Sequence, residues 1–326
     1  MDNNFFNNLN SLLWWIPFKK LRVIIKETIL CLFEIREQNR FIIERLNYIS
    51  NDNDLGYVIV SISGGFTDQI RHYNLAYSIE KIFNRKIKYD ISWYKDCGMD
   101  LMEINKRNFE LSNIFKDIQF DIATEEEILI ARKYCQIKDT NNIRNILKTK
   151  RIVYIEANIW NFDGLGTETD GLLDITKVLD LDKYIFPLLN ENNKNIYYDI
   201  INNDFSIACH VRRTDYSMMK DVNIDNDNYF KNAIDLISKK LNKKKELKVY
   251  FFSDDIKWVK NKIIPLIEKD YNYFIVEENN NEKGYIDFYL ISLCKYHISS
   301  AGNFCLFAHN FSKFENKILI TQNDFK

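Results

Sequence analysis

The sequence lacks an excess of charge of either sign. Its 326 residues include 45 lysines and arginines and 46 aspartates and glutamates, which leaves a formal net charge of -1 at pH 7. Because a nucleic-acid-binding surface usually shows as a basic excess, we expect no nucleic-acid partner. Any anion site must therefore be a local cluster of basic side chains.

Paired cysteines and long apolar runs are also missing. The absence of a CxxC pair argues against a disulfide framework or a zinc site and favours a reducing compartment. No apolar run approaches the ~20 residues of a membrane-spanning helix, and the N-terminus has no secretion-signal pattern. We expect no metal and a cytoplasmic protein. The six cysteines are Cys31, Cys97, Cys135, Cys209, Cys294 and Cys305.

Residues 1–53 are predicted to form a helical extension. Within residues 21–49, apolar side chains recur at alternating steps of four and three, which is typical of a coiled coil joining two copies of the chain. Further apolar residues widen the stripe, so a helix lying on its own globular domain is an equal alternative. Aromatic and basic residues between positions 5 and 20 suit docking or, less often, peripheral contact at the inner face of the cytoplasmic membrane.

Two α/β units follow, at residues 54–195 and 196–326. In the first, strands are predicted at 57–62, 88–93 and 152–155, with helices at 68–83 and near 125–135. The second follows the polar residues 190–195. Its predicted strands are 206–211, 249–252, 273–276, 297–299 and 317–320, and its helices are 229–241, 256–267, 284–294 and 304–311. This alternation predicts two Rossmann-like domains facing a cleft.

The densest cluster of polar residues ends the strand predicted at 206–211. His210, Arg212, Arg213 and Asp215 stand there, where a parallel strand presents its carboxyl end to a ligand. An arginine fork matches two phosphate oxygens, and a nearby carboxylate such as Asp215 can hold that fork in place. The cluster therefore predicts a phosphate site. The alternative is an internal ion pair that closes a loop.

Two more clusters follow predicted strands of the second unit. The run Ser253-Asp254-Asp255 suits helix capping by one carboxylate and contact with a sugar or a base by the other. The run 299–303 leaves backbone N–H groups at a helix start, where they can meet a diphosphate, although an ordinary capped turn fits equally well.

A fourth cluster closes the first strand of the first unit. Gly64 and Gly65 allow a tight turn, and Asp68 and Gln69 follow them. As a nucleotide signature this turn is weak, because the third glycine of a dinucleotide fingerprint is missing.

Taken in order, the four clusters resemble the bacterial α-1,2-fucosyltransferases and their relatives among α-1,6- and protein O-fucosyltransferases. The resemblance runs from about Tyr57 to near the end of the chain. Its HxRRxD box matches His210, Arg212, Arg213 and Asp215, its GGxGNQ turn is similar to Gly64, Gly65, Asp68 and Gln69, and a late box matches Asp287 to Ile298. The departures are Thr67 and Asp68 in the glycine turn and the absence of the family's SxSFSWW segment after Ser300.

The resemblance implies an α/β protein of the GT-B type. Its first half would take an acceptor glycan, and its second half would bind GDP-fucose and transfer the sugar with inversion and without a metal or other cofactor. The expected acceptor is O2 of galactose in a cell-surface glycan. Two alternatives are another nucleotide sugar on the same fold and a catalytically silent glycan-binding or scaffold protein.

The implied site has one principal residue, Arg212, as the diphosphate clamp. The sequence identifies no general base; Asp68 is the candidate, with helix capping as its alternative. The residues implied on the donor side are His210, Arg213, Asp215, Ser253, Asp254, Asp255, Ser299, Ser300 and Asn303. Those implied on the acceptor side are Gly64, Gly65 and Gln69.

Overall fold

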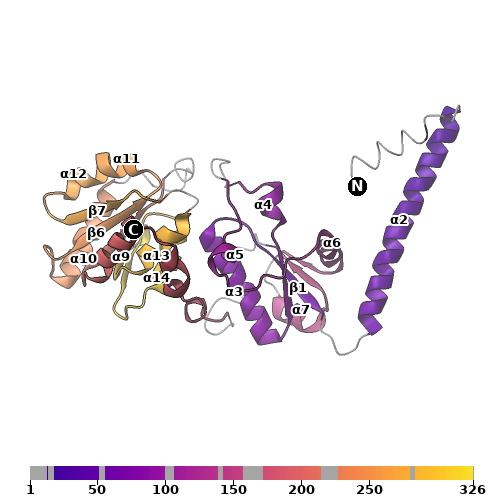
Figure 1. The fold of residues 1–326 in the computed structure, drawn as a ribbon, viewed down its shortest axis with the longest axis horizontal. Helices are drawn as coiled ribbons and strands as arrows, with labels where there is room; N and C mark the ends of the chain where they lie inside the picture. Colours follow the sequence, from indigo (N-terminus) through magenta and orange to yellow (C-terminus); the bar gives the residue numbers. More distant parts are fainter. Residues whose placement is uncertain are drawn as a thin grey trace.

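The computed structural model describes residues 13, 18–50, 56–99, 106–138, 142–156, 172–213, 227–279 and 283–325. These residues form a long N-terminal helix followed by two α/β lobes, which lie in a row in Figure 1. The predicted fold class, with two parallel sheets and a helical extension, is confirmed.

Helix α2 (Lys19–Ser50) stands apart from both lobes (Figure 1). No side chain that the structure describes in α2 is buried, and Ile24 and Leu32 are 58% and 60% exposed. The structure therefore does not show the predicted alternative in which this helix lies on its own domain. Within the described ranges, no helix is long and apolar enough to cross a membrane.

The first lobe is built on a parallel sheet in the strand order β2-β1-β4-β3. Central strand β1 is almost wholly buried, which explains its run of Tyr, Val and Ile. The strands are β1 (Tyr57–Ser61), β2 (Lys86–Asp90), β3 (Gln136–Ile137) and β4 (Val153–Ile155). The helices are α3 (Phe66–Phe83), α4 (Ser92–Asp96), α5 (Leu111–Ile114), α6 (Glu125–Tyr134) and α7 (Ile143–Thr149).

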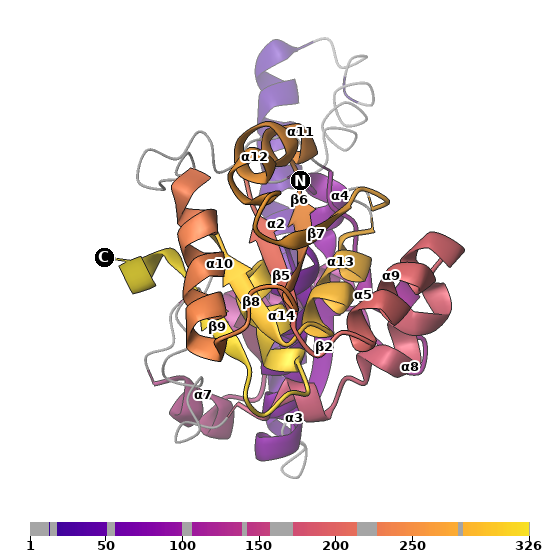
Figure 2. The ribbon, with the colours of Figure 1, turned by 90° about the vertical axis from the view of Figure 1, so that its left-hand side faces the viewer.

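The second lobe contains a parallel sheet in the order β7-β6-β5-β8-β9. Figure 2 shows helix α10 on one side of this sheet and helices α13 and α14 on the other. The strands are β5 (Ser206–Val211), β6 (Lys248–Ser253), β7 (Asn272–Val276), β8 (Tyr296–Ser299) and β9 (Ile318–Ile320). The helices are α10 (Asp227–Leu241), α11 (Ile256–Trp258), the π-turn η4 (Val259–Ile263), α12 (Ile264–Ile267), α13 (Gly284–Ser292), α14 (Phe304–Phe311) and η6 (Gln322–Phe325).

The segment between the sheets is helical rather than a polar linker. It contains η1 (Ile175–Lys177), α8 (Leu181–Ile185), η2 (Phe186–Leu188) and α9 (Glu191–Ile201). Asn190 caps α9 by accepting the Asn193 N–H at 2.8 Å. From the second sheet, the Tyr250 hydroxyl donates to the Asp199 carboxylate at 3.0 Å. The predicted boundary between residues 195 and 196 therefore falls inside a helix that packs on the second lobe.

Smaller differences concern the ends of elements. The strand predicted at 88–93 lies at 86–90, and α4 begins at Ser92. The helix predicted at 256–267 is divided by the π-turn η4, and the one predicted at 284–294 ends at Ser292. Strand β3 and helices α5, α7, α8 and α9 were not predicted.

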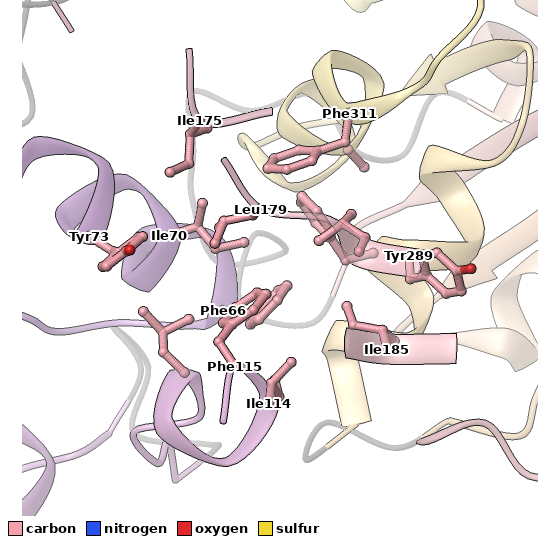
Figure 3. Packing of buried hydrophobic residues seen from close by; sticks show 14 of the residues in the cluster. Phe66, Ile70, Tyr73, Ile114, Phe115, Ile175, Leu179, Ile185, Tyr289 and Phe311 are labelled. Atoms are coloured by element: carbon pink, nitrogen blue, oxygen red, sulfur yellow. The ribbon is translucent and has the colours of Figure 1, made fainter. Parts of the chain in front are cut away.

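The two lobes share one hydrophobic core, shown in Figure 3. Phe66 of α3 stacks on Phe115 with ring centroids 6.5 Å apart, and it meets Phe288 of α13 edge-on at 5.3 Å. Ile185 of α8 and Phe311 of α14 belong to the same buried cluster. The start of α3 is therefore fixed against the second lobe by apolar burial.

Candidate active site

Three of the predicted clusters meet at one edge of the second sheet. Strand β5 is buried at all six positions, with β6 and β8 as its neighbours. Arg212 and Arg213 follow β5, Asp254 follows β6, and Ser300 follows β8. Because these strands are parallel, their carboxyl ends lie together, which is where α/β sheets bind ligands.

The Arg212 guanidinium is held by a nearly buried carboxylate. Its Nη1 atom lies 3.0 Å from Oδ2 of Asp254, with 20% of the arginine side chain exposed and 7% of the aspartate. The Arg212 backbone N–H also donates to Oγ of Ser300 at 2.8 Å. Arg212 therefore forms an internal ion pair, which was the alternative to a phosphate site, and its partner is Asp254. Asp215 lies outside the described residues.

Arg213 shares the same carboxylate and turns its guanidinium toward an aromatic ring. Its backbone N–H donates to Oδ1 of Asp254 at 2.8 Å, so Asp254 positions both arginines. The guanidinium carbon lies 4.0 Å from the centre of the Trp258 ring, and Nε lies 3.4 Å from Oδ2 of Asp255. This arrangement immobilises a second cation beside the first.

Ser253 and Asp255 bind within the protein. The Ser253 hydroxyl donates to the Val211 carbonyl at 2.8 Å and accepts the Asp255 N–H at 2.9 Å. Asp255 caps α11 by accepting the Trp258 N–H at 3.0 Å. The helix cap in this run is therefore Asp255.

His210 is buried and packs on an aromatic ring. Its imidazole stacks on Phe304 with centroids 5.1 Å apart. Burial, together with the nearby charge of Arg212, lowers the pKa of His210 to about 3, so the ring is neutral at physiological pH. Among the described residues, its buried Nδ1 atom has no hydrogen-bond partner.

The predicted serines and asparagine at the end of β8 differ in accessibility. Ser299 is buried, and its carbonyl accepts the Tyr229 hydroxyl at 2.7 Å. Ser300 is buried too, and its backbone N–H donates to the His210 carbonyl at 3.2 Å. Asn303 is exposed at the N-cap position of α14 and forms no capping hydrogen bond through its side chain.

The glycine turn in the first lobe depends on Gly64 more than on Gly65. Gly64 has a φ of +79°, and a Cβ atom there would lie 2.6 Å from Oδ2 of Asp68. A Cβ at Gly65 would meet nothing within 4 Å. Gly64 is therefore required by both the backbone conformation and the space available.

Gln69 is fully buried, so it supports the turn from inside. Its amide nitrogen donates to the Asn108 carbonyl at 2.8 Å and to the Gly64 carbonyl at 3.3 Å. Its amide oxygen accepts the Glu110 N–H at 2.8 Å. Gln69 was predicted to line the acceptor side, but its contacts are those of a residue that fixes the segment 108–110 to the glycine turn.

Asp68, the candidate base, has partners within its own helix. Its Oδ1 atom lies 3.7 Å from Nη1 of Arg71. Burial raises the pKa of Asp68, and the charge of Arg71, a hydrogen bond from the Gly65 backbone and the charge of Arg107 oppose that rise. The backbone contact agrees with the capping alternative.

Residues 173–325 match the family model described as Glycosyl transferase family 11. Over this range the chain is similar to glycosyl transferase family 11. The matched range contains Arg212, Asp254 and Ser300, which meet at the sheet edge described above. Among the described residues of the chain, no group of three or more His, Cys, Asp or Glu side chains is arranged to hold a metal.

The chain is similar to two Escherichia coli proteins over most of its length. It is 27% identical over 288 residues to the O-antigen biosynthesis glycosyltransferase WbnK, covering 80% of this chain and 92% of that protein. It is 22% identical over 257 residues to an alpha-1,2-colitosyltransferase, covering 77% and 86%. Among solved structures, the fucosyltransferase NodZ from Bradyrhizobium aligns with a TM-score of 0.44 and 14% identity over 78% of this chain and 91% of that chain.

The sequence did not indicate Glu110, whose backbone is joined to the glycine turn through Gln69. Burial raises the pKa of its carboxyl to about 7, although the charge of Arg107 acts in the opposite direction. Burial and then the charge of Glu110 raise the pKa of Tyr285, at the start of α13 in the other lobe. No spacing pattern indicates Glu110, because the residue that anchors its backbone, Gln69, is 41 positions away.

Proposed function

We propose that this enzyme transfers fucose from GDP-fucose to a glycan hydroxyl with inversion, and that Arg212 stabilises the departing GDP. The observation that carries the proposal is the fixed position of the Arg212 guanidinium where β5, β6 and β8 end. As the bond from the anomeric carbon to the diphosphate lengthens, negative charge grows on the diphosphate. A cation already held in place stabilises that charge without having to reorganise.

Other residues of the second lobe support the same anion. Arg213 lies beside Arg212 on the shared Asp254 carboxylate, which makes Asp254 a positioning residue. The N-terminus of α14 has backbone N–H groups that the Asn303 side chain does not cap. Such groups suit a diphosphate oxygen. The chemistry we propose uses these groups and no metal or other cofactor.

The proposed sugar and acceptor rest on the sequence motifs and on the names of the relatives. The HxRRxD box resembles that of α-1,2-fucosyltransferases, which favours fucose and O2 of galactose. One relative is named for O-antigen biosynthesis, which favours a cell-surface polysaccharide as the acceptor. The other is named an alpha-1,2-colitosyltransferase, so transfer of colitose is the second candidate function.

Replacement of Arg212 tests the proposal. Purified wild type, Arg212→Ala and Arg212→Lys are assayed with GDP-fucose and with GDP-colitose against galactose-terminated glycans, with and without EDTA. We expect Arg212→Ala to lower the transfer rate by about 100- to 1,000-fold, and EDTA to have no effect. The matched control is Lys257→Ala, which removes an exposed cation from neighbouring α11. An Arg212→Ala rate equal to that of the control contradicts the assignment.

We further propose that α2 pairs with a second copy of the chain. Its apolar residues at heptad spacing include Leu21, Leu32 and Ile35, which are 44%, 60% and 45% exposed. A single copy leaves that stripe in water, whereas a parallel or antiparallel partner with the same spacing buries it.

A further inference from the structure

The carboxyl group of Glu110 is held in place but is not used by the fold. Its Oε2 atom is buried and has no hydrogen-bond partner in the part of the chain that the structure describes. The backbone of the same residue is tied down, because the Glu110 N–H donates to the fully buried Gln69 at 2.8 Å. A buried polar atom without a partner is rare in folded proteins and calls for a ligand or a catalytic role.

The groups around Glu110 come from both lobes. The Tyr94 hydroxyl lies near the same charged groups. Burial raises its pKa, the charges of Glu110 and Asp68 raise it further, and the charge of Arg107 opposes the rise. Burial and then the negative charge of Glu110 raise the pKa of Tyr285, which belongs to the second lobe. Arg71, which is near Asp68, adds a further positive charge on α3. The carboxyl group therefore lies where the lobes meet.

A series of aromatic contacts connects this place to the proposed diphosphate site. Tyr285 lies 6.2 Å from Phe66, and Phe66 lies 5.3 Å from Phe288. Phe288 is 5.5 Å from Phe304, which in turn stacks on His210 at 5.1 Å. The side of the first lobe that carries Glu110 thus packs toward the end of β5, where Arg212 begins the proposed diphosphate site.

We propose that Glu110 is the general base for the acceptor hydroxyl, an inference that rests on the proposed function. The acceptor O–H proton passes to the Glu110 carboxylate as the acceptor oxygen bonds to the anomeric carbon. The bond between that carbon and the diphosphate oxygen breaks, and its electron pair leaves on GDP beside Arg212. Nothing else is consumed.

The electrostatics of the site agree with this role. Burial raises the pKa of Glu110 to about 7, which is the range in which a carboxylate is both ionised and basic enough to accept a proton at neutral pH. Asp68 is less suited to the role, because Arg71 and the Gly65 backbone already contact its carboxyl group. The charge that acts on Glu110 is that of Arg107, which opposes the rise of its pKa.

The test compares wild type, Glu110→Gln, Glu110→Asp and Asp68→Asn with whichever nucleotide sugar the wild type turns over. We expect Glu110→Gln to lower kcat for transfer by about 100-fold or more, with the Kd for GDP unchanged by calorimetry. In wild type, kcat should fall below about pH 7 as Glu110 is protonated. In Glu110→Gln this acid limb should disappear, and Glu110→Asp should recover part of the rate. Asp68→Asn should keep the limb.

The outcomes separate the two proposals. If wild type turns over neither GDP-fucose nor GDP-colitose, the proposed function fails, whatever Glu110 does. If wild type turns over one of them and Glu110→Gln stays within threefold of its rate or keeps the acid limb, the base assignment alone is wrong. Should Glu110→Gln not fold, a wild-type kcat that is flat from pH 5 to 8 overturns the assignment without any variant.

Discussion

Glu110 should make the enzyme less stable as the pH rises, and the Glu110→Gln variant should remove that dependence. Burial raises the pKa of the folded carboxyl to about 7, against an ordinary value of 4.5 in the unfolded chain. Between these values the folded state holds a proton that the unfolded state has lost. The free energy of unfolding therefore falls with rising pH across this window, by about 1.4 kcal/mol per unit.

The full window corresponds to roughly 3 kcal/mol, an upper figure because part of the side chain is exposed. Glutamine resembles the protonated acid, so Glu110→Gln and wild type should have similar stability at pH 4.5. At pH 8 the variant should be more stable by about 1 to 3 kcal/mol. This direction is opposite to that of most core substitutions, which destabilise.

Urea unfolding of both proteins at pH 4.5, 6 and 8, followed by circular dichroism, measures the difference. Other titrating groups contribute equally to both chains and cancel. Asp287, for example, has its pKa raised to about 7 by burial, although a hydrogen bond from Asn279 opposes the rise. A difference between variant and wild type that does not change with pH would show that the Glu110 carboxyl titrates normally. It would also remove the electrostatic support for its role as a base.

Three other predictions follow from the contacts described above. Gly64→Ala should destabilise the protein by about 1 to 2 kcal/mol or more in urea unfolding, because φ is +79° there, whereas Gly65→Ala should cost less than about 1 kcal/mol. Asp254→Asn should lower kcat about 100-fold through misplacement of Arg212, and a rate within threefold of wild type in the transfer assay contradicts that role. Deletion of residues 1–53 should reduce the assembly to single chains in light scattering while transfer persists; an unchanged number of chains rejects pairing through α2.

The elements that the sequence predicted well are apolar runs with clear ends. Strand β5 (Ser206–Val211) and helix α14 (Phe304–Phe311) match their predicted bounds because apolar runs end abruptly in polar residues at both places. Helix α9 was missed because its first turn, residues 191–195, is entirely polar. Its buried contacts begin with Asn193 and continue at Ile196 and Ile200, one residue per turn.

The candidate site could be predicted by position but not by role. Local spacing indicated Arg212, because the end of a strand is a local property. Whether Asp215 or Asp254 holds that arginine depends on which strand lies beside β5, and this is a property of the sheet order. Gln69 was expected to face a ligand, but its partners lie 39 and 41 residues away and enclose it. Glu110 depends in the same way on tertiary packing, since its raised pKa arises from burial.

The contacts of Asp254 explain why the two arginines form one unit. A single carboxylate accepts the Arg213 backbone N–H through Oδ1 and pairs with the Arg212 guanidinium through Oδ2. The Arg212 guanidinium and the Arg213 backbone are therefore anchored on the same side chain, and Ser300 fixes the Arg212 backbone from β8. Electrostatic stabilisation depends on charges that do not move during the reaction. The rigidity that favours an ion pair as an internal strut is therefore the same property that a diphosphate clamp needs, so the two interpretations of this motif are complementary.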